Sequence, residues 1–134
     1  MNLVLHLRLA GAGLMLLAFV HVFFPRRFGW REELPRLSLL NRQMFGVHVF
    51  FIALVLLFFG AVSLVLAEEL LAGGRLAQGV LTGFVVIWSL RLLTQLFVYD
   101  RSLWRGHRFN TTVHVVFSAF WTYLVVVYAL ALRA

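Results

Sequence analysis

Four long apolar stretches, separated by connections that carry most of the charge, constrain this chain more than any other feature. A transmembrane helix needs about 20 mostly apolar residues to cross about 30 Å of hydrocarbon. Residues 3–24, 44–67, 76–98 and 109–132 all meet that requirement. The composition agrees, because 63% of the residues are hydrophobic and only 13% are charged, against about 50% and 25% in soluble domains. We therefore predict an all-α integral membrane protein.

The connections between the apolar stretches are short, which makes successive helices antiparallel neighbours. The simplest architecture is a single domain, residues 1–134, folded as an up-down bundle of four transmembrane helices. The first stretch lacks a small-residue cleavage site and is followed by an arginine pair, so we interpret it as a retained helix rather than a signal peptide. In residues 28–42, leucines at three-residue spacing among charges predict an amphipathic cytoplasmic connection on the membrane surface.

The arginines predict the orientation of the bundle, since Lys and Arg concentrate in cytoplasmic connections. Only three arginines flank the other side: Arg8, Arg75 and Arg133. The first and third connections carry Arg26, Arg27, Arg31, Arg36, Arg42, Arg101, Arg105 and Arg108. We therefore expect an inner (cytoplasmic) membrane protein with both termini outside and these two connections in the cytoplasm.

Composition also excludes several classes of function. The chain has no cysteine, which excludes disulfides, thiolate metal sites and covalently attached c-type haem. The net charge of +7 arises because the chain has twelve arginines and only five acidic residues, and most of these arginines flank apolar stretches, where contact with anionic membrane lipid explains them. No basic stripe with interleaved aromatic residues lies outside these stretches, so nucleic-acid binding is not expected.

Three of the five histidines occur in nearly the same pentapeptide: VHVFF at residues 20–24 and 47–51, and VHVVF at residues 113–117. Because the predicted helices alternate in direction, sequence position converts to depth. His21, His48 and His114 each fall about 5–10 Å below the cytoplasmic interface. His107 lies just outside this layer, one heptad before His114. The repeat therefore predicts a histidine layer in the cytoplasmic half of the bundle.

Arg91 and Gln95 bring the third helix into the same layer, about 12 Å along the axis from Asp100. An arginine inside a membrane span is expected to face the protein interior and to have a partner. No Asp or Glu occurs inside any of the other spans. Backbone and Gln95 are one possible partner, and an anionic ligand such as a haem propionate, a lipid phosphate or a substrate carboxylate is another.

The same residues suggest a cofactor. In an up-down bundle the second and fourth helices are diagonal, so His48 and His114 are the expected ligands of one b-type haem. His21 would be an alternate ligand or a hydrogen-bond donor to the ligands, and Arg91 with Gln95 would hold a propionate. A transition metal on His21, His48, His107 and His114 is the alternative, although Arg91 makes a bare divalent ion less favourable.

These features favour electron transfer, with a quinone or a larger membrane complex as partner, and leave open whether the chain is an enzyme. Two other functions fit the same residues. In a non-catalytic accessory or assembly subunit without cofactor, the histidines would hydrogen-bond between helices. In a homo-oligomeric, proton-coupled carrier they would relay protons.

The outer half of the predicted bundle carries small residues in place of polar ones. Gly11, Gly60, Gly79 and Gly83 are spaced so that backbones could approach closely. We therefore expect helices that contact tightly on the outer side and diverge on the cytoplasmic side.

Overall fold

The computed structural model describes residues 2–134 and contains helices without any strand in that range. Four helical segments are long and apolar enough to cross a membrane. The first, Leu3–Arg27, consists of α1 (Leu3–Val20), η1 (His21–Phe23) and α2 (Phe24–Arg27). The others are α4 (Leu39–Val65), α6 (Arg75–Phe97) and α7 (Arg108–Arg133). The chain is therefore all-helical with four candidate transmembrane helices, as predicted.

The second of these helices begins at Leu39, five residues before its predicted start. Ser38 caps the helix, because its side chain accepts a hydrogen bond from the backbone N–H of Asn41 at 3.4 Å. The last four residues of the predicted surface segment, residues 39–42, therefore belong to α4. The first connection also contains two short helices, α3 (Trp30–Glu33) and η2 (Leu34–Arg36).

The chain divides into two compact units. The N-terminal unit is Arg8–Leu66, and the hairpin unit comprises the residues up to Leu7 together with Ala67–Ala134. Each is described by itself. A single up-down bundle of all four helices stays a prediction.

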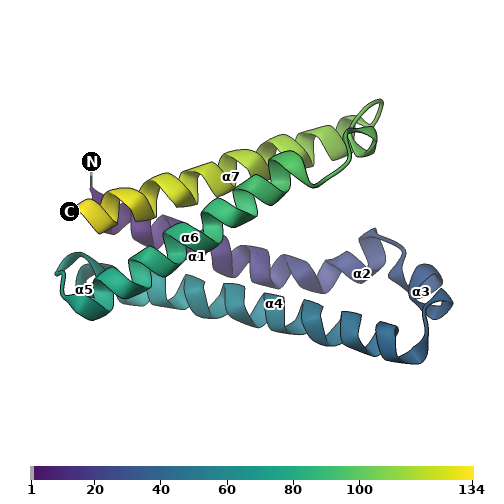
Figure 1. The fold of residues 1–134 in the computed structure, drawn as a ribbon, viewed down its shortest axis with the longest axis horizontal. Helices are drawn as coiled ribbons and strands as arrows, with labels where there is room; N and C mark the ends of the chain where they lie inside the picture. Colours follow the sequence, from purple (N-terminus) through teal and green to yellow (C-terminus); the bar gives the residue numbers. More distant parts are fainter. Residues whose placement is uncertain (1) are drawn as a thin grey trace. The chain divides into compact units, whose positions relative to one another are not determined.

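In the hairpin unit, α6 and α7 lie side by side as an antiparallel pair (Figure 1). Phe84 meets Tyr128 edge-on at a ring distance of 4.9 Å, and Trp88 stacks on Trp121 at 5.4 Å with 6° between the ring planes. His6 Nδ1 lies 3.0 Å from the Tyr123 hydroxyl, which ties the start of α1 to α7. The buried stripe of this interface repeats every three or four residues: Ala77, Leu81, Phe84 and Trp88 on α6, and Trp121, Leu124, Tyr128 and Ala131 on α7.

In the N-terminal unit, α1 and α4 cross backbone to backbone at two glycines. A Cβ added to Gly11 would lie 2.6 Å from the carbonyl oxygen of Gly60, and one added to Gly60 would lie 2.8 Å from that of Gly11. The expected close approach is therefore found at these two residues. It is not found at Gly79 and Gly83, where an added Cβ would meet no described atom within 4 Å. Large aromatic side chains, rather than glycines, make the α6–α7 contact.

Candidate functional site

The buried stripe of the α6–α7 hairpin changes from apolar to polar toward the loop that joins the two helices. On α6 the spacing that places Phe84 and Trp88 in the interface continues to Arg91 and Gln95. On α7 His114 and Ser118 precede Trp121 at the same spacing. Residues three and four apart share one face of a helix. We call these four residues, Arg91, Gln95, His114 and Ser118, the polar layer of the hairpin.

The pairing register of the two helices places Arg91 opposite Ser118. Trp88 contacts Trp121, and Gln95 contacts His114, so seven residues forward on α6 correspond to seven residues back on α7. Arg91 is three residues after Trp88, and Ser118 is three residues before Trp121. The two side chains therefore start from the same level, between the tryptophan pair and the Gln95–His114 pair.

Gln95 and His114 form the hydrogen-bonded end of the layer. Gln95 is 5% exposed, and its Nε2 donates to His114 Nδ1 at 2.8 Å. The Trp104 ring stacks on the imidazole at 4.1 Å with 28° between the planes. The imidazole is thereby held by an amide on one edge and an indole on one face, while its Nε2 has no hydrogen-bond partner among the described residues.

Arg91 packs against aromatic rings without meeting a hydrogen-bond acceptor at its buried nitrogen. Its guanidinium carbon lies 4.9 Å from the centre of the Trp121 ring and 5.8 Å from that of Tyr99. Such cation–π contacts stabilise by about 0.5–2 kcal/mol but leave the N–H groups unused. Arg91 Nη1 is buried without a hydrogen-bond partner in the described residues, and no carboxylate pairs with it there.

Two further buried donors lie on α7 near the level of Arg91. Ser118 Oγ and Trp121 Nε1 are also buried without a partner among the described residues. Leaving a buried polar group unpaired costs about 1–3 kcal/mol, and more for a charged group. Guanidinium and indole N–H groups can only donate, and a hydroxyl can donate. A group that accepts hydrogen bonds, and above all an anionic one, therefore has the complementary chemistry.

The loop beyond the layer is held by its own polar residues. Asn110 Nδ2 donates to the Leu103 carbonyl at 2.9 Å, and the Thr111 hydroxyl donates to the Trp104 carbonyl at 2.8 Å, so α7 fixes the segment that carries Trp104. Hydrogen bonds from the side chain and backbone of Ser102 hold the pKa of Asp100 below its usual value, so this carboxylate is ionised at neutral pH.

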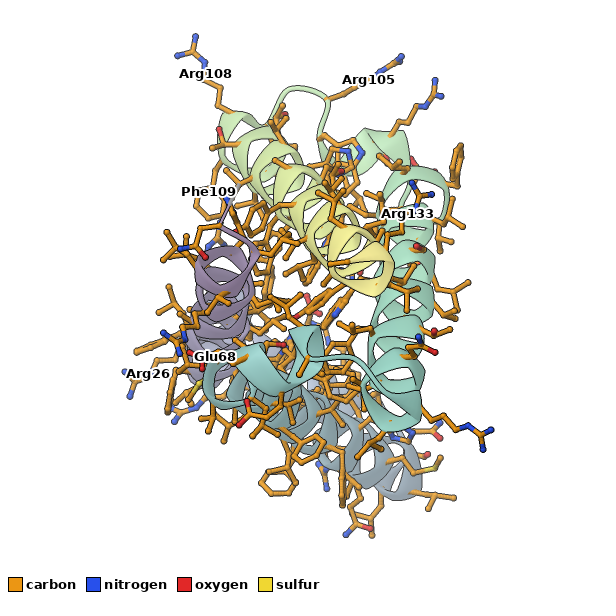
Figure 2. All side chains as sticks on the ribbon, turned by 90° about the vertical axis from the view of Figure 1, so that its left-hand side faces the viewer. Arg26, Glu68, Arg105, Arg108, Phe109 and Arg133 are labelled. Atoms are coloured by element: carbon orange, nitrogen blue, oxygen red, sulfur yellow. The ribbon has the colours of Figure 1, made fainter. Side chains whose placement is uncertain are left out.

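Arg105 and Arg108 at this loop extend away from the hairpin (Figure 2). Both side chains are exposed, whereas Arg91 is partly buried within the helix pair. They therefore offer exposed controls for charge substitutions at Arg91.

The other two predicted ligands lie in the N-terminal unit. His21 is half-buried and its Nδ1–H donates to the Leu17 carbonyl at 2.8 Å. His48 is exposed and its Nδ1–H donates to the Met44 carbonyl at 2.7 Å. A carbonyl can only accept, so in both rings Nε2 carries the lone pair, which is the tautomer of an imidazole that ligates iron or another metal through Nε2. The gathering of these rings with His114 in one layer stays a prediction.

The alternative metal site has no support in this structure. The described residues contain no group of three or more His, Cys, Asp or Glu side chains arranged to hold a metal ion. His107 is exposed immediately before α7, where its carbonyl accepts a hydrogen bond from the Thr111 hydroxyl at 3.1 Å.

The sequence predicts Arg91, Gln95 and His114 as site residues but indicates no site role for their aromatic neighbours. Trp104 has no role in the predicted site, whereas its ring covers the imidazole of His114. Trp121 was given no role, although it contacts Arg91. The signal for Trp121 and Ser118 was present, because both continue the three- and four-residue spacing from His114 along α7.

Comparison with protein-family models, curated proteins and solved structures finds no match for this chain. The proposed function therefore rests on the geometry of the chain's own residues.

Proposed function

We propose that this chain is a small inner-membrane protein that binds one b-type haem against the polar layer of the α6–α7 hairpin and serves electron transfer. The observation that carries the proposal is the unpartnered, buried Nη1 of Arg91. Arg91 lies one helical turn before Gln95 on α6, and Gln95 hydrogen-bonds to the His114 imidazole, whose Nε2 is also without a partner in the described residues. A haem supplies both complements, namely a carboxylate for the guanidinium and an iron for the imidazole.

Gln95 positions the imidazole of His114. To ligate iron through Nε2, the imidazole must carry its proton on Nδ1 and donate it. The Gln95 amide has both a donor and an acceptor end, so a half-turn of that amide lets its oxygen accept this proton. His48 and His21, each with Nδ1–H already bonded to a backbone carbonyl, are the candidates that would hold the haem together with His114. The bound haem would supply a one-electron redox centre.

The positive-inside distribution supports a layer on the cytoplasmic side of the membrane, with both termini outside. The connections of the chain are short and carry no catalytic motif, which favours a quinone or a larger membrane complex as the redox partner.

The first experiment is an optical spectrum of the protein purified in mild detergent after expression with ample haem, recorded before and after reduction. We expect a Soret band and sharpened visible bands on reduction. His114→Ala should remove these bands or change the ligation. Arg91→Gln should weaken haem retention about 10- to 100-fold, as expected for loss of a charge-assisted hydrogen bond. Arg105→Gln, at an exposed arginine of the same hairpin, should retain wild-type haem.

A featureless visible spectrum from haem-replete wild-type protein would contradict the haem proposal. Quinone that is extracted from the wild type but not from Arg91→Gln would reassign the layer to a quinone, whose carbonyl oxygens also accept hydrogen bonds. If neither is found and Arg91→Gln loses only its association with another subunit, the layer belongs to an assembly contact, as in the accessory-subunit alternative.

A further inference from the structure

A second feature, independent of the haem proposal, lies in the N-terminal unit, where α2, α3, η2 and the start of α4 line an open groove of about 480 Å³. This volume is within the range of small-molecule sites, about 300–1,000 Å³. Trp30 and Phe45 form one wall, with ring centres 4.8 Å apart and planes at 85°. Pro25, Val49 and Phe50 continue the apolar lining. The groove is therefore largely apolar and aromatic.

Two of the residues that line this largely apolar groove carry a positive charge. Arg31 on α3 and Arg42 in the first turns of α4 both line it, and neither has an ion pair or a hydrogen bond from its side chain to a described residue. The first turn of α4 contains no acidic residue, so the positive end of its helix dipole is uncompensated there. The segment 25–42 has five arginines and two glutamates, a net charge of +3. An anion is the charge complement of these two arginines and of the segment that carries them.

The polarity changes along α4 in one direction. Arg42 is near the start of the helix, Phe45 and Gly46 are one turn further in, and Val49 and Phe50 are two turns further in. The same groove is bounded by the end of one candidate membrane span, at Arg27, and the start of the next, at Leu39. A charged end at the boundary of two spans and an apolar end directed along them match a molecule with an anionic head and a hydrocarbon chain.

We propose that this groove binds one anionic phospholipid. Its phosphate would lie between Arg31 and Arg42, and an acyl chain would lie along Gly46, Val49 and Phe50. Arginines near a membrane surface each contribute about 1 kcal/mol of attraction to anionic lipid, which corresponds to about fivefold in affinity. The apolar walls add contact that a free phosphate ion does not make.

The test uses the full-length protein in nanodiscs that contain phosphatidylglycerol and phosphatidylcholine with identical acyl chains. The lipids that stay bound after transfer to detergent are counted by native mass spectrometry. We expect the wild type to retain one phosphatidylglycerol in preference to phosphatidylcholine. Arg31→Gln and Arg42→Gln should each reduce that preference about fivefold, and Arg42→Lys should retain it because the charge remains.

Gly46→Leu tests the acyl-chain end of the groove. Gly46 lines the groove, and a Cβ added to it meets no described atom within 4 Å, so the larger side chain displaces no backbone. We expect this variant to lose the retained lipid. Gly79→Leu, at another glycine with no described atom near its added Cβ, is the matched control and should retain it. Circular dichroism of each variant verifies that the helices are intact.

Three results would overturn the proposal. The first is a wild type that shows no preference for phosphatidylglycerol. The second is an equal loss of preference in Arg31→Gln and in Arg36→Gln, which removes an exposed arginine of the same connection outside the groove. That result would indicate diffuse attraction. The third is a folded Gly46→Leu variant that still retains the lipid, which would place the acyl chain elsewhere.

Discussion

At the scale of single residues, Arg91 is the side chain whose surroundings depart furthest from what folding alone requires. Its guanidinium has aromatic contacts on Trp121 and Tyr99, yet its buried Nη1 has no acceptor in the described residues. A methionine of similar length would fill the same space without an unpaired donor. An arginine at this position therefore lowers stability in the absence of a ligand and provides a charge that a ligand can use.

The variant Arg91→Met separates these two effects. Removing an unpaired buried donor should raise the free energy of unfolding by more than the loss of the cation–π contacts lowers it. The ligand-free protein should therefore become more stable by about 1 kcal/mol. Thermal unfolding followed by circular dichroism in detergent measures this change, and the optical spectrum of the same sample measures haem retention, which should fall. Arg105→Met, at an exposed arginine, should change neither. A large decrease in the stability of Arg91→Met would instead make Arg91 a structural residue.

At the scale of helices, the two pairs within the units are held by different kinds of contact. The α6–α7 pair interlocks large aromatic side chains, as in the Trp88–Trp121 stack. The α1–α4 pair brings Gly11 and Gly60 into backbone contact, which in a membrane compensates for the absence of a hydrophobic driving force between helices. Only the second kind of contact forbids any added side-chain atom.

Gly11→Ala should therefore destabilise the α1–α4 crossing by about 1–3 kcal/mol. The physical reason is that its Cβ would meet only backbone atoms, at 2.6 Å from the Gly60 oxygen and 2.7 Å from the Leu64 nitrogen, and neither can move aside alone. Gly79→Ala has free space and better helix propensity, so it should be neutral or stabilising by up to about 1 kcal/mol. The midpoints of thermal unfolding compare the two. Equal midpoints would show that α1 and α4 do not form this contact in the membrane.

At the scale of the whole molecule, orientation decides which compartment the polar layer adjoins. The exposed residues Ala72 and Arg105 lie in the second and third connections, on opposite sides of the membrane in the proposed topology. The chain has no cysteine, so a single introduced cysteine reports the accessibility of its own position alone.

Ala72→Cys should react with a membrane-impermeant maleimide added to intact cells, and Arg105→Cys should react only after the cytoplasmic side is opened. The physical reason is that eight arginines flank the spans on the side of the first and third connections and three on the other. The opposite labelling pattern would place the polar layer on the outer side of the membrane and contradict the proposed localisation.

The candidate site was partly predictable from the sequence. The spacing of Arg91 and Gln95 predicts that the two side chains share one face of a helix. In the structure both continue the buried stripe of α6. The repeated pentapeptide that begins with VHV identifies His114, but it does not indicate that Gln95 is the hydrogen-bond partner of His114. That pairing depends on the register between two helices, because each residue of slip turns a side chain by about 100°.

The amino-acid sequence by itself determined that the chain forms four long apolar helices and approximately where they begin and end. In hydrocarbon every backbone N–H and C=O must be satisfied within the segment, so an apolar stretch of sufficient length has little alternative to a helix. Only the tertiary structure decided that Trp104 covers His114, that Gly11 meets Gly60, and that Arg91 Nη1 is left without a partner. These features arise between segments distant in sequence, where helix rotation, register and loop conformation act together.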